Sequence, residues 1–413
     1  MSRQAENGGQ RLAPLPKGWR ATRVKRICSM HSGDHIAGDE ICEEGEFPVY
    51  GGNDLRGYYP KYNCEGPMLI VGRQGALCGN VHRINGKFWA TEHALITTLT
   101  HFDNLDYLYY LFTDLNFNQY VSQSAAQPGL AASKILQVET VLPPRPEQER
   151  IAAFLDEKCA AVDKAIEVKR KQLESVEPQW ANLLHNVTLR GIRPSRLQKT
   201  TNAIIEKIPV GWKLKRLRYI GRCQNGISKD GQYFGYGFPF VTYGDVYNNM
   251  ALPVVASGLV ESTEDERIRY SVKRGDVFFT RTSETADEVG FSSVCLKTIP
   301  DATFAGFVIR VRPVTEDLLP EFAQYYFRNP FVSQYFAKEM MVVTRASLNQ
   351  DILKSLPVLI PPRDEQVQIA KYLGERRSYF DSLAANLRKQ IEILKQYRKS
   401  LIHEYVTGVR RVV

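Results

Sequence analysis

The chain has 413 residues, which is enough for two or three ordinary domains, each with a core of its own. Hydrophobic residues make up 43% of the chain and charged residues 24%, as in a globular protein. No apolar run approaches the ~18 residues that a membrane span requires, so no membrane-spanning helix is expected. The formal net charge of +9 favours a polyanionic partner such as nucleic acid, although charge alone does not establish one.

Cysteine usage and the distribution of charge further narrow the classes of protein that the sequence allows. The seven cysteines are odd in number and scattered, which fits reduced thiols in a cytoplasm better than a disulfide framework. Residues 145–200 carry 11 basic and 8 acidic side chains and residues 357–413 carry 11 and 6, whereas residues 20–140 carry 10 and 13. The basic excess therefore lies on two segments, and the remainder of the chain would need local clusters to bind DNA.

The first 143 residues are predicted to form a short N-terminal lead-in segment followed by one domain. Residues 1–14 lack the apolar core of a secretory signal and are expected to be disordered. Residues 15–143 form the first predicted domain, with β-branched and aromatic runs that are punctuated by glycine and typical of a mixed sheet. These runs are 47–52, 68–84 and 88–99, and a helical piece follows at 105–121. Aromatic residues at helical spacing in that piece indicate core packing rather than a platform for stacking bases.

A long helix is predicted over residues 144–192. Paired prolines at 143 and 144 disfavour helix before this point, Pro146 suits a first turn, and Glu147 favours the positive end of the helix dipole. Apolar residues then recur at alternating steps of three and four, which predicts a seam against another helix. Gly191 and Pro194 supply the stop signal.

The remaining chain repeats this plan. A linker is predicted at 193–207, a second domain at 208–361, a second long helix at 362–408 and a tail at 409–413. The second domain has strand-like runs at 238–246, 275–283, 289–296 and 304–313 and a helical piece at 318–340. The predicted seam residues are Val162, Ile166, Leu173, Val176 and Leu183 in the first helix, and Phe380, Leu387, Ile391, Leu394 and Leu401 in the second. Because both seams need a partner, the two helices are expected to pair with each other in antiparallel orientation.

Matched landmarks show that the plan is a duplication. LPKGWRATRVKRI at 15–27 corresponds to IPVGWKLKRLRYI at 208–220, and LPPRPEQERIAAFL at 142–155 to IPPRDEQVQIAKYL at 360–373. KRKQLE at 169–174 likewise meets LRKQIE at 387–392. The period near two hundred residues is far longer than that of solenoid repeats, so a domain and its helix have been duplicated together. The fold class predicted is α+β: two mixed domains with an internal pseudo-two-fold repeat, joined by two long antiparallel helices.

Candidate DNA contacts are polar side chains on glycine-bounded loops. Arginine can grip guanine with two hydrogen bonds, and asparagine or glutamine can grip adenine in the same way. The candidates are Tyr50, Asn53, Arg73, Gln74 and His82 in the first domain, and Tyr243, Arg281, Thr282, Ser283 and Arg345 in the second. For any one of them, a satisfied turn or a surface ion pair is an equally good interpretation.

Motifs for chemistry are missing from the sequence. There is no phosphate-binding GxxxxGK[ST] loop, no Asn-Pro-Pro-aromatic signature of methyl transfer and no glycine-rich cofactor loop. Acidic pairs such as Glu43-Glu44 lack a lysine at nuclease spacing, and Cys64, Cys78 and His82 lack the close Cys-x-x-Cys pair of a zinc site. We therefore expect no catalytic, cofactor-binding or metal-binding residue in this chain.

The duplicated Pro-x-Gly-Trp opening, the PPR-x-EQ helix start and the KQ-(L/I)-E stretch together resemble the type I restriction–modification specificity subunit (HsdS). FPVYGGND in the first domain and GDVFFTRTSET in the second resemble the same family, and the likeness covers nearly the whole chain beyond residue 14. The resemblance implies two target-recognition domains that each read half of a bipartite double-stranded DNA site, with the helices setting the spacer between the halves.

The same resemblance implies the partners. Two methyltransferase subunits would dock on the helices, and restriction subunits that carry the motor and nuclease would join them. S-adenosylmethionine, ATP and Mg²⁺ would then belong to these partners, the complex would be cytoplasmic, and no membrane would be involved. Two alternatives from other classes are a stand-alone pseudo-dimeric DNA-binding regulator, which would bind specifically without partners, and a single-chain nuclease, which would cut DNA with magnesium alone.

Overall fold

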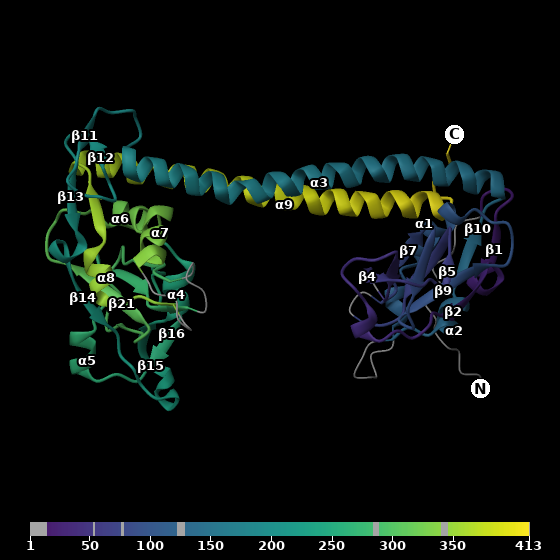
Figure 1. The fold of residues 1–413 in the computed structure, drawn as a ribbon, viewed down its shortest axis with the longest axis horizontal. Helices are drawn as coiled ribbons and strands as arrows, with labels where there is room; N and C mark the ends of the chain where they lie inside the picture. The colour runs from purple at the N-terminus through teal and green to yellow at the C-terminus, as the bar shows by residue number, and fades with distance from the viewer. Residues whose placement is uncertain are drawn as a thin grey trace, which may run out of the picture. The chain divides into compact units, whose positions relative to one another are not determined.

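The computed structural model describes residues 15–52, 54–75, 78–121, 129–283, 289–339 and 346–412, and it divides the chain into two compact units. One unit consists of Met1–Arg170 and Arg388–Val413, and the other of Lys171–Leu387. Both long helices, α3 (Arg145–Arg190) and α9 (Arg363–Val406), contribute a stretch to each unit (Figure 1). Each unit therefore combines one strand-rich region with segments of two helices.

The first unit contains two four-stranded sheets. Its strands are β1 (Arg20–Arg23), β2 (Cys28–Ser32), β3 (Phe47–Tyr50), β4 (Leu55–Tyr59), β5 (Cys64–Glu65), β6 (Met68–Gly72), β7 (Val81–Ile84), β8 (Lys87–Ala90), β9 (Ala94–Leu99) and β10 (Glu139–Leu142). Its shorter helices are α1 (Leu105–Leu115) and α2 (Ala132–Leu136), with 3-10 turns η1 (Val24–Arg26), η2 (Gly38–Glu40) and η3 (Phe117–Tyr120). One sheet has the order β2-β9-β6-β7 and is antiparallel, and the other has the order β4-β3-β8-β5 with a parallel β3–β8 pair.

The second unit repeats the four-stranded antiparallel sheet, but its other sheet has three strands in place of four. Its strands are β11 (Leu197–Lys199), β12 (Lys207–Pro209), β13 (Lys213–Arg216), β14 (Gly221–Asn225), β15 (Phe234–Val241), β16 (Gly258–Val260), β17 (Val277–Thr280), β18 (Thr282–Ser283), β19 (Ser292–Val294), β20 (Thr303–Phe304), β21 (Val308–Pro313), β22 (Ala346–Ser347) and β23 (Pro357–Ile360). Its shorter helices are α4 (Tyr243–Asn248), α5 (Glu264–Arg269), α6 (Pro320–Tyr326), α7 (Pro330–Glu339) and α8 (Gln350–Ser355), with turns η4 (Leu217–Tyr219) and η5 (Gly231–Tyr233).

The sheet orders show how closely the copies agree. The order β14-β21-β17-β19 corresponds strand for strand to β2-β9-β6-β7, and the parallel β15–β20 pair corresponds to β3–β8. The Pro-x-Gly-Trp landmark of each copy leads into a strand that pairs with the last strand of its region, β1 with β10 and β13 with β23. The predicted α+β fold with an internal repeat is therefore confirmed.

Element boundaries differ from expectation at three places. The strand expected over 238–246 ends at Val241, because Thr242 accepts a hydrogen bond from the Asp245 amide and caps α4. The helical piece expected over 105–121 is α1 plus η3, interrupted at Asn116 in the left-handed region. The piece expected over 318–340 is α6 and α7, with a break at 327–329.

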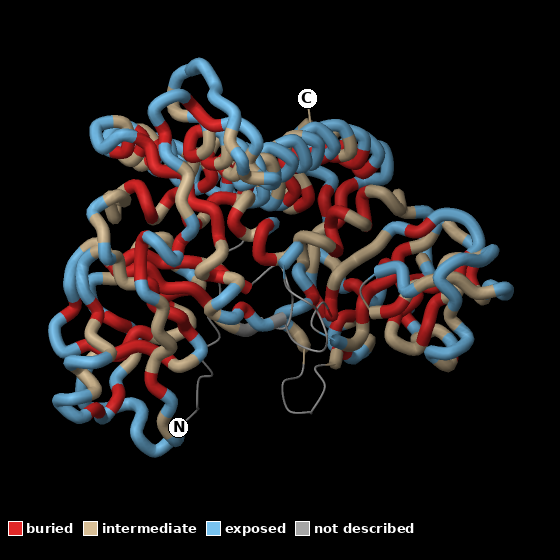
Figure 2. Tube along the Cα trace, turned by 60° about the vertical axis from the view of Figure 1, so that its left-hand side comes forward, coloured by how far each residue is buried: buried red, intermediate tan, exposed pale blue. Residues whose placement is uncertain are grey.

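The aromatic side chains of these short helices are core, as predicted. Tyr107 and Phe112 of α1, like Phe322 and Tyr326 of α6, are fully buried. In Figure 2 the buried residues follow the strands and short helices inside each region, and exposed residues follow the outer turns of α3 and α9. No described helix is both long and apolar enough to cross a membrane.

The PPR-x-EQ motif at the start of each long helix has a structural explanation. The Gln148 amide donates to the Pro143 carbonyl at 3.0 Å and to Asp103 at 2.9 Å, and it accepts from the Asn104 amide at 2.8 Å. Gln366 makes the equivalent set with the Pro361 and Asp317 carbonyls and the Leu319 amide, at 2.9, 2.8 and 2.8 Å. Both glutamines are buried, so each fastens its helix start to the preceding region.

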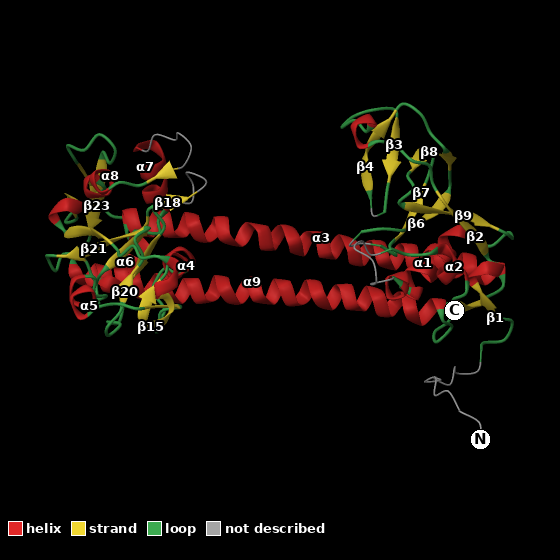
Figure 3. Ribbon diagram, turned by 90° about the horizontal axis from the view of Figure 1, so that it is seen from below, coloured by secondary structure: helices red, strands yellow, loops and turns green. Residues whose placement is uncertain are grey.

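The two long helices pack against each other in antiparallel orientation (Figure 3), as predicted. Within the first unit, Asp163 pairs with Arg398 at 3.0 Å and the ring of Phe154 contacts that of Tyr405. Within the second unit, Glu177 pairs with Arg377 at 3.2 Å, and Val176 packs with Leu387. The ten proposed seam residues are all buried or half-buried: Val162, Ile166, Leu173, Val176, Leu183, Phe380, Leu387, Ile391, Leu394 and Leu401.

The far end of each helix packs on the region that the other helix follows. In the first unit, Leu401, Ile402 and Val406 of α9 join a core cluster that includes Trp19 and Tyr107. In the second unit, Trp180, Leu184 and Val187 of α3 join the cluster of Trp212 and Tyr326. The helices end at Arg190 and Val406, and Gly191 and Gly408 follow them with positive φ, which glycine adopts without strain. Each core therefore depends on segments that are distant in the sequence.

Candidate DNA interface

Each unit presents an edge made of short segments that follow the strands of its sheets. In the first unit these are 33–35, 50–52, 73–75, 91–93 and 129–130, and in the second 226–228, 241–243, 281–283, 305–307 and 347–348. We call this set the loop edge. Most of the proposed DNA contacts belong to it, so its geometry decides which of them can act together.

The backbone of the loop edge is the same in both units. The amide of Arg73 donates to the His93 carbonyl at 2.8 Å, and that of Arg281 to the Phe307 carbonyl at 2.9 Å. The carbonyls of the two arginines accept from Leu130 at 2.8 Å and from Leu348 at 2.7 Å. Arg73 and Arg281 therefore occupy equivalent positions, each directly after the third strand of its antiparallel sheet.

Further hydrogen bonds extend the match to the neighbouring segments. Thr91 donates to the Tyr50 carbonyl at 2.9 Å, and Ala305 to that of Val241 at 3.1 Å. Gly33 donates to the Ala94 carbonyl at 3.1 Å, and Gly226 to that of Val308 at 3.2 Å. A Cβ at Gly33 or Gly226 would lie 2.1–2.2 Å from a backbone oxygen, so only glycine allows the segments to approach this closely.

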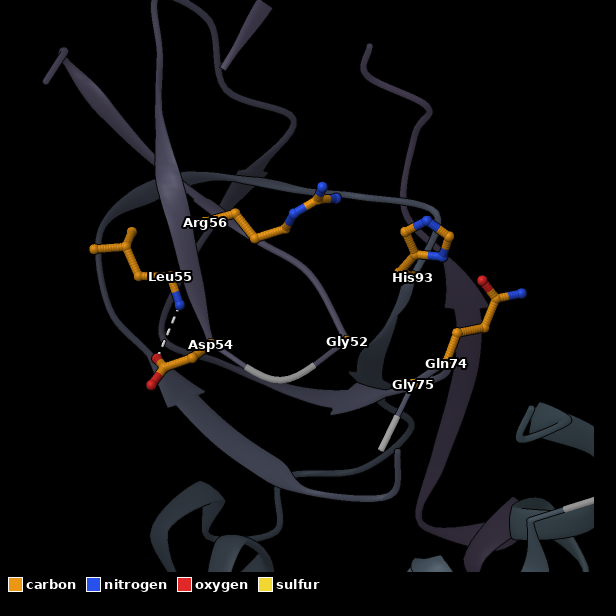
Figure 4. Close-up of a pocket in the computed structure, with 7 residues that line it drawn as sticks. All are labelled: Gly52, Asp54, Leu55, Arg56, Gln74, Gly75 and His93. Atoms are coloured by element: carbon orange, nitrogen blue, oxygen red, sulfur yellow. Dashed lines mark hydrogen bonds between the residues drawn. The ribbon is translucent and has the colours of Figure 1, made fainter. Parts of the chain in front are cut away.

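In the first unit the loop edge borders a surface hollow of about 400 Å³. Figure 4 shows the guanidinium of Arg56, the amide of Gln74 and the imidazole of His93 around it, with Gly52 and Gly75 at its base. A Cβ on Gly52 would lie 2.4 Å from the Gln74 carbonyl, which explains the Gly-Gly pair in FPVYGGND. The hollow thus gathers three polar side chains, of which Arg56 and Gln74 carry N–H groups that can donate hydrogen bonds.

Close contacts with the Glu92 carboxylate orient the imidazole of His93. Glu92 lies 3.3 Å from Nε2 of His93 and 3.1 Å from Nδ1 of His35. Burial opposes the charge on Glu92, but its backbone hydrogen bond and the two histidines outweigh burial and lower its pKa. The carboxylate therefore stays ionised and fixes the orientation of His93 at the rim of the hollow.

The other proposed contacts of the first unit lie in different settings. Arg73 is half-buried and donates to Ser32 at 2.7 Å, so part of its guanidinium is already committed to the fold. Tyr50 and His82 were proposed as loop residues, but they lie on β3 and β7. Burial lowers the pKa of His82, with Asp54 opposing, so its imidazole is neutral near pH 7. Asn53 lies outside the described residues.

In the second unit α4 presents an aromatic group beside the loop edge. Tyr243, the first residue of α4 rather than a loop residue, stacks on Tyr247 with ring centroids 5.8 Å apart, and Tyr247 contacts Phe291. The half-buried guanidinium of Arg328 lies 4.8 Å from the Phe291 ring. It donates to the carbonyls of Val246, Tyr247, Asn249 and Ser292 at 2.8, 2.7, 3.1 and 2.5 Å.

Arg328 thus satisfies carbonyls at the C-terminal end of α4, where a helix lacks partners of its own. Burial lowers the pKa of Arg328 to about 10, and the guanidinium stays charged near neutral pH. No sequence pattern indicated this role, because a lone arginine among apolar residues looks like a surface residue.

The remaining candidates in the second unit are only partly described. Arg281 is half-buried and fixed through its backbone. Thr282 and Ser283 pair through β18 with Ser347 and Ala346, and their side chains lie outside the described part, as does Arg345. Arg56, His93 and Phe307 were missed from the sequence. The Gly-Gly before Arg56 was a usable signal, but nothing near Phe307 pointed to it.

The loop edges offer hydrogen-bond donors, aromatic surface and arginines on a rigid frame, the side chains by which proteins contact base edges and phosphates. Among the described residues, no three histidine, cysteine or acidic side chains gather as a metal site would require. Cys64 lies on β5 and Cys78 beside Gly79, apart from any such group.

Comparison with known families shows where this arrangement belongs. The family described as "Type I restriction modification DNA specificity domain" matches residues 16–177 and again residues 209–393. The chain belongs to this family of HsdS specificity subunits. The two matches take in both strand-rich regions and most of both long helices, so each half of the repeat carries one copy of the specificity domain.

Named HsdS relatives support the assignment. The chain is 41% identical over 148 residues to the type I restriction enzyme EcoprrI specificity subunit of Escherichia coli, covering 35% of this chain and 37% of that protein. It is 27% identical to a putative MjaX specificity subunit of Methanocaldococcus jannaschii, covering 49% of this chain and 47% of the relative. These matches therefore span less than half of either relative. A putative specificity subunit of Haemophilus influenzae, S.HindORF215P, is 23% identical over 84% of both chains.

Solved HsdS-like structures share the fold. A chain from a study of complex assembly and conformational transition of the type I R-M system superposes with a TM-score of 0.73 at 15% identity, covering 96% of this chain and 99% of that one. The HsdS subunit from Thermoanaerobacter tengcongensis superposes with a TM-score of 0.55 at 16% identity, covering 95% and 98%. At such low identity the likeness concerns the fold alone.

Proposed function

We propose that this chain is the DNA-specificity subunit of a type I restriction–modification complex and that its two loop edges each read one half of a bipartite site. The observation that carries the proposal is the duplicated loop edge, in which one backbone frame displays different side chains in the two copies. A frame kept constant while its side chains differ suits two readers of unlike half-sites.

The domain scheme that goes with this function assigns recognition to residues 15–143 and 208–361. The helices at 144–192 and 362–408 set the length of the unread spacer and dock the methyltransferase subunits, and residues 193–207 are a linker. The near-equivalent helices support two docking surfaces related by the internal repeat, and hence two methyltransferase subunits.

Chemistry in this proposal belongs to the partners. The methyltransferase subunits bind S-adenosylmethionine and flip the target base, and restriction subunits add ATP, Mg²⁺, translocation and cleavage. This chain contributes no reacting group; it positions the partners on the DNA, in the cytoplasm where the chromosome lies. Residues 20–140 carry more acidic than basic side chains, so the partner subunits make much of the contact with the DNA phosphates. The isolated chain therefore binds DNA weakly.

Methylation-site sequencing of DNA from cells that express this chain with its modification subunit tests the proposal. We expect one asymmetric motif with two specified parts and an unspecified spacer. Replacing residues 15–143 by the same region of another family member should change one part only. A continuous motif, or a change in both parts, would contradict the proposal.

A binding assay distinguishes a specificity subunit from a stand-alone DNA-binding regulator. Tight, sequence-specific binding by the purified chain without a methyltransferase subunit would favour the regulator. Binding that becomes specific only when the modification subunit is added supports the specificity subunit. Magnesium-dependent cleavage by the chain alone would instead indicate a nuclease.

A further inference from the structure

His93 and Phe307 occupy the same position in the two loop edges. Each carbonyl accepts the amide hydrogen of the arginine after the third strand, at 2.8 Å from Arg73 and 2.9 Å from Arg281. The turns around them are closed by the same bond, Ala94 to Thr91 at 2.9 Å and Val308 to Ala305 at 3.0 Å. One backbone position therefore carries an imidazole in the first copy and a phenyl ring in the second.

The phenyl ring is displayed by a tight turn. Phe307 is 66% exposed, whereas Ala305 and Val308 on either side of its turn are buried at 8% and 0%. A Cβ on Gly306 would lie 2.3 Å from Oγ of Ser228, so the turn is pressed against the neighbouring segment. Because its backbone is fixed on both sides, the ring is held outward at the loop edge.

An exposed phenylalanine by itself means little, since single apolar side chains are common on protein surfaces. Phe307 is nevertheless informative because it is equivalent to His93, which lies at the rim of the hollow with Arg56 and Gln74 (Figure 4). The same place in the fold thus carries a polar imidazole in the first unit and an apolar phenyl ring in the second.

Base edges in the major groove differ in the same way. Most of their groups donate or accept hydrogen bonds, and the C5-methyl of thymine is the apolar one that phenylalanine can contact. Resting on the proposed function, we propose that His93 and Phe307 are equivalent specificity-determining residues. Phe307 contacts a thymine methyl in the half-site read by the second unit, and His93 faces a base edge in the half-site read by the first.

The thymine contact can be tested by removing the methyl from the DNA and the ring from the protein. The assembled complex of this chain with its modification subunits is titrated with duplexes in which each thymine of the second half-site, on either strand, is replaced in turn by deoxyuridine. For the unaltered chain we expect one position at which the replacement weakens binding about three- to tenfold, the effect of losing one buried methyl. Phe307→Ala should bind thymine and deoxyuridine equally at that position and keep the other preferences.

Val255→Ala is the matched control, because Val255 is an exposed apolar residue of the same unit, at 78%, outside the loop edge. It should retain the full sensitivity to deoxyuridine. The proposal is overturned if Phe307→Ala keeps that sensitivity, if no thymine of the second half-site responds, or if the half-site contains none.

The histidine contact has its own readout. His93→Phe should alter the preferred base at one position of the first half-site in methylation-site sequencing and leave the second half-site unchanged. An unchanged first half-site would overturn the equivalence of the two positions. Failure of the proposed function is seen separately, because the unaltered complex would then methylate no bipartite site.

Discussion

At the residue scale, each copy packs a histidine of a long helix against a polar side chain, but the polar side chain differs between the copies. His403 of α9 lies 3.1 Å from the carboxylate of Asp114 at the end of α1, and His185 of α3 lies 3.1 Å from the side-chain oxygen of Asn329 after α6. The histidines are 218 positions apart, the same offset as Glu147 and Glu365. A half-buried carboxyl in one unit thus occupies the position of a neutral amide in the other, so only the stability of the first unit should depend on titration of this group.

We expect Asp114→Asn to change the pH dependence of the first unit. Burial raises the pKa of Asp114 above 3.8, and His403 and Lys399 offset part of the rise. A carboxyl with a raised pKa stabilises the fold fully below its unfolded-state pKa, and this contribution is lost as the pH rises through its folded-state pKa. The variant should therefore gain stability relative to the parent as the pH rises above 3.8.

Amide exchange in α1 and β9, measured across that pH range, gives the readout. Asn329→Asp is the reciprocal control, because it places a carboxyl at a fully buried site in the second unit. It should weaken protection in α6 increasingly as the pH rises. A stability difference between Asp114→Asn and the parent that does not vary with pH would contradict the argument.

A second residue-scale prediction concerns Arg328. Replacing it with methionine keeps much of the apolar stem but leaves the carbonyls at the end of α4 without their donor. Hydrogen bonds to a charged group contribute about 1.5–3 kcal/mol each, so we expect a loss of roughly 3 kcal/mol or more in the unfolding free energy of the second unit. Thermal unfolding would measure it, with the exposed Arg269→Met as the control expected to stay within about 0.5 kcal/mol. Equal effects of the two substitutions would refute the positioning role.

At the element scale, antiparallel pairing of α3 with α9 sharpens the expectation that the helices set the spacer. Deleting seven residues from one helix alone would shift the ion pairs Asp163–Arg398 and Glu177–Arg377 relative to each other. Deleting residues 167–173 together with 385–391 removes one heptad from both helices between these pairs. The helix pair then shortens by roughly 10 Å, equivalent to about three base pairs.

We expect the double deletion to shorten the unspecified spacer by about three base pairs while both half-site sequences persist. Methylation-site sequencing checks both features at once. The deletion in α3 alone is the control, and it should lower stability and methylation because the seam falls out of register. New bases in either half-site would show that the helices help to read sequence.

Sequence reasoning succeeded where a signal is local and repeated. Three- and four-residue apolar spacing predicted both long helices, and the matched landmarks predicted the shared topology. It failed where a role depends on partners far along the chain. In the sequence, Gln148 is one polar helix residue among many, and its role is visible only from its hydrogen bonds with Asn104 and Asp103. Likewise, Phe307 became a candidate only because its carbonyl accepts the amide hydrogen of Arg281. Tyr243 was placed on a strand because the cap formed by Thr242 and Asp245 was not recognised.

At the scale of the whole molecule, the C-terminal turns of α9 belong to the core of the N-terminal region. Leu401, Ile402 and Val406 are buried there, the Tyr107 hydroxyl donates to the Val406 carbonyl at 3.2 Å, and Arg411 pairs with Glu147 at 2.9 Å. Deleting residues 401–413 should expose this core and destabilise the first unit by several kcal/mol, since each large apolar residue removed from a core costs about 2–5 kcal/mol.

Hydrogen exchange localises the effect of that deletion. Protection should fall across β2, β9 and α1 and remain in β14, β17 and β21, which belong to the other unit. The conservative variant Val406→Ala should produce a smaller loss in the same elements. Uniform loss across both units, or none in the first, would contradict the packing described.

The dependence of the first core on the end of α9 also bears on how the protein is made. About 260 residues separate Leu142, the end of the first region, from Leu401, so synthesis at about 5–20 residues per second leaves about 13–52 s between their appearance. During that interval the first region exists without the helix segment that covers Trp19 and Tyr107. The nascent first region would thus expose apolar surface on the ribosome and offer chaperones a binding site until residues 401–406 of α9 are made. Completion of the first core is consequently tied to synthesis of the end of α9, and a product truncated before Leu401 would lack that completed core.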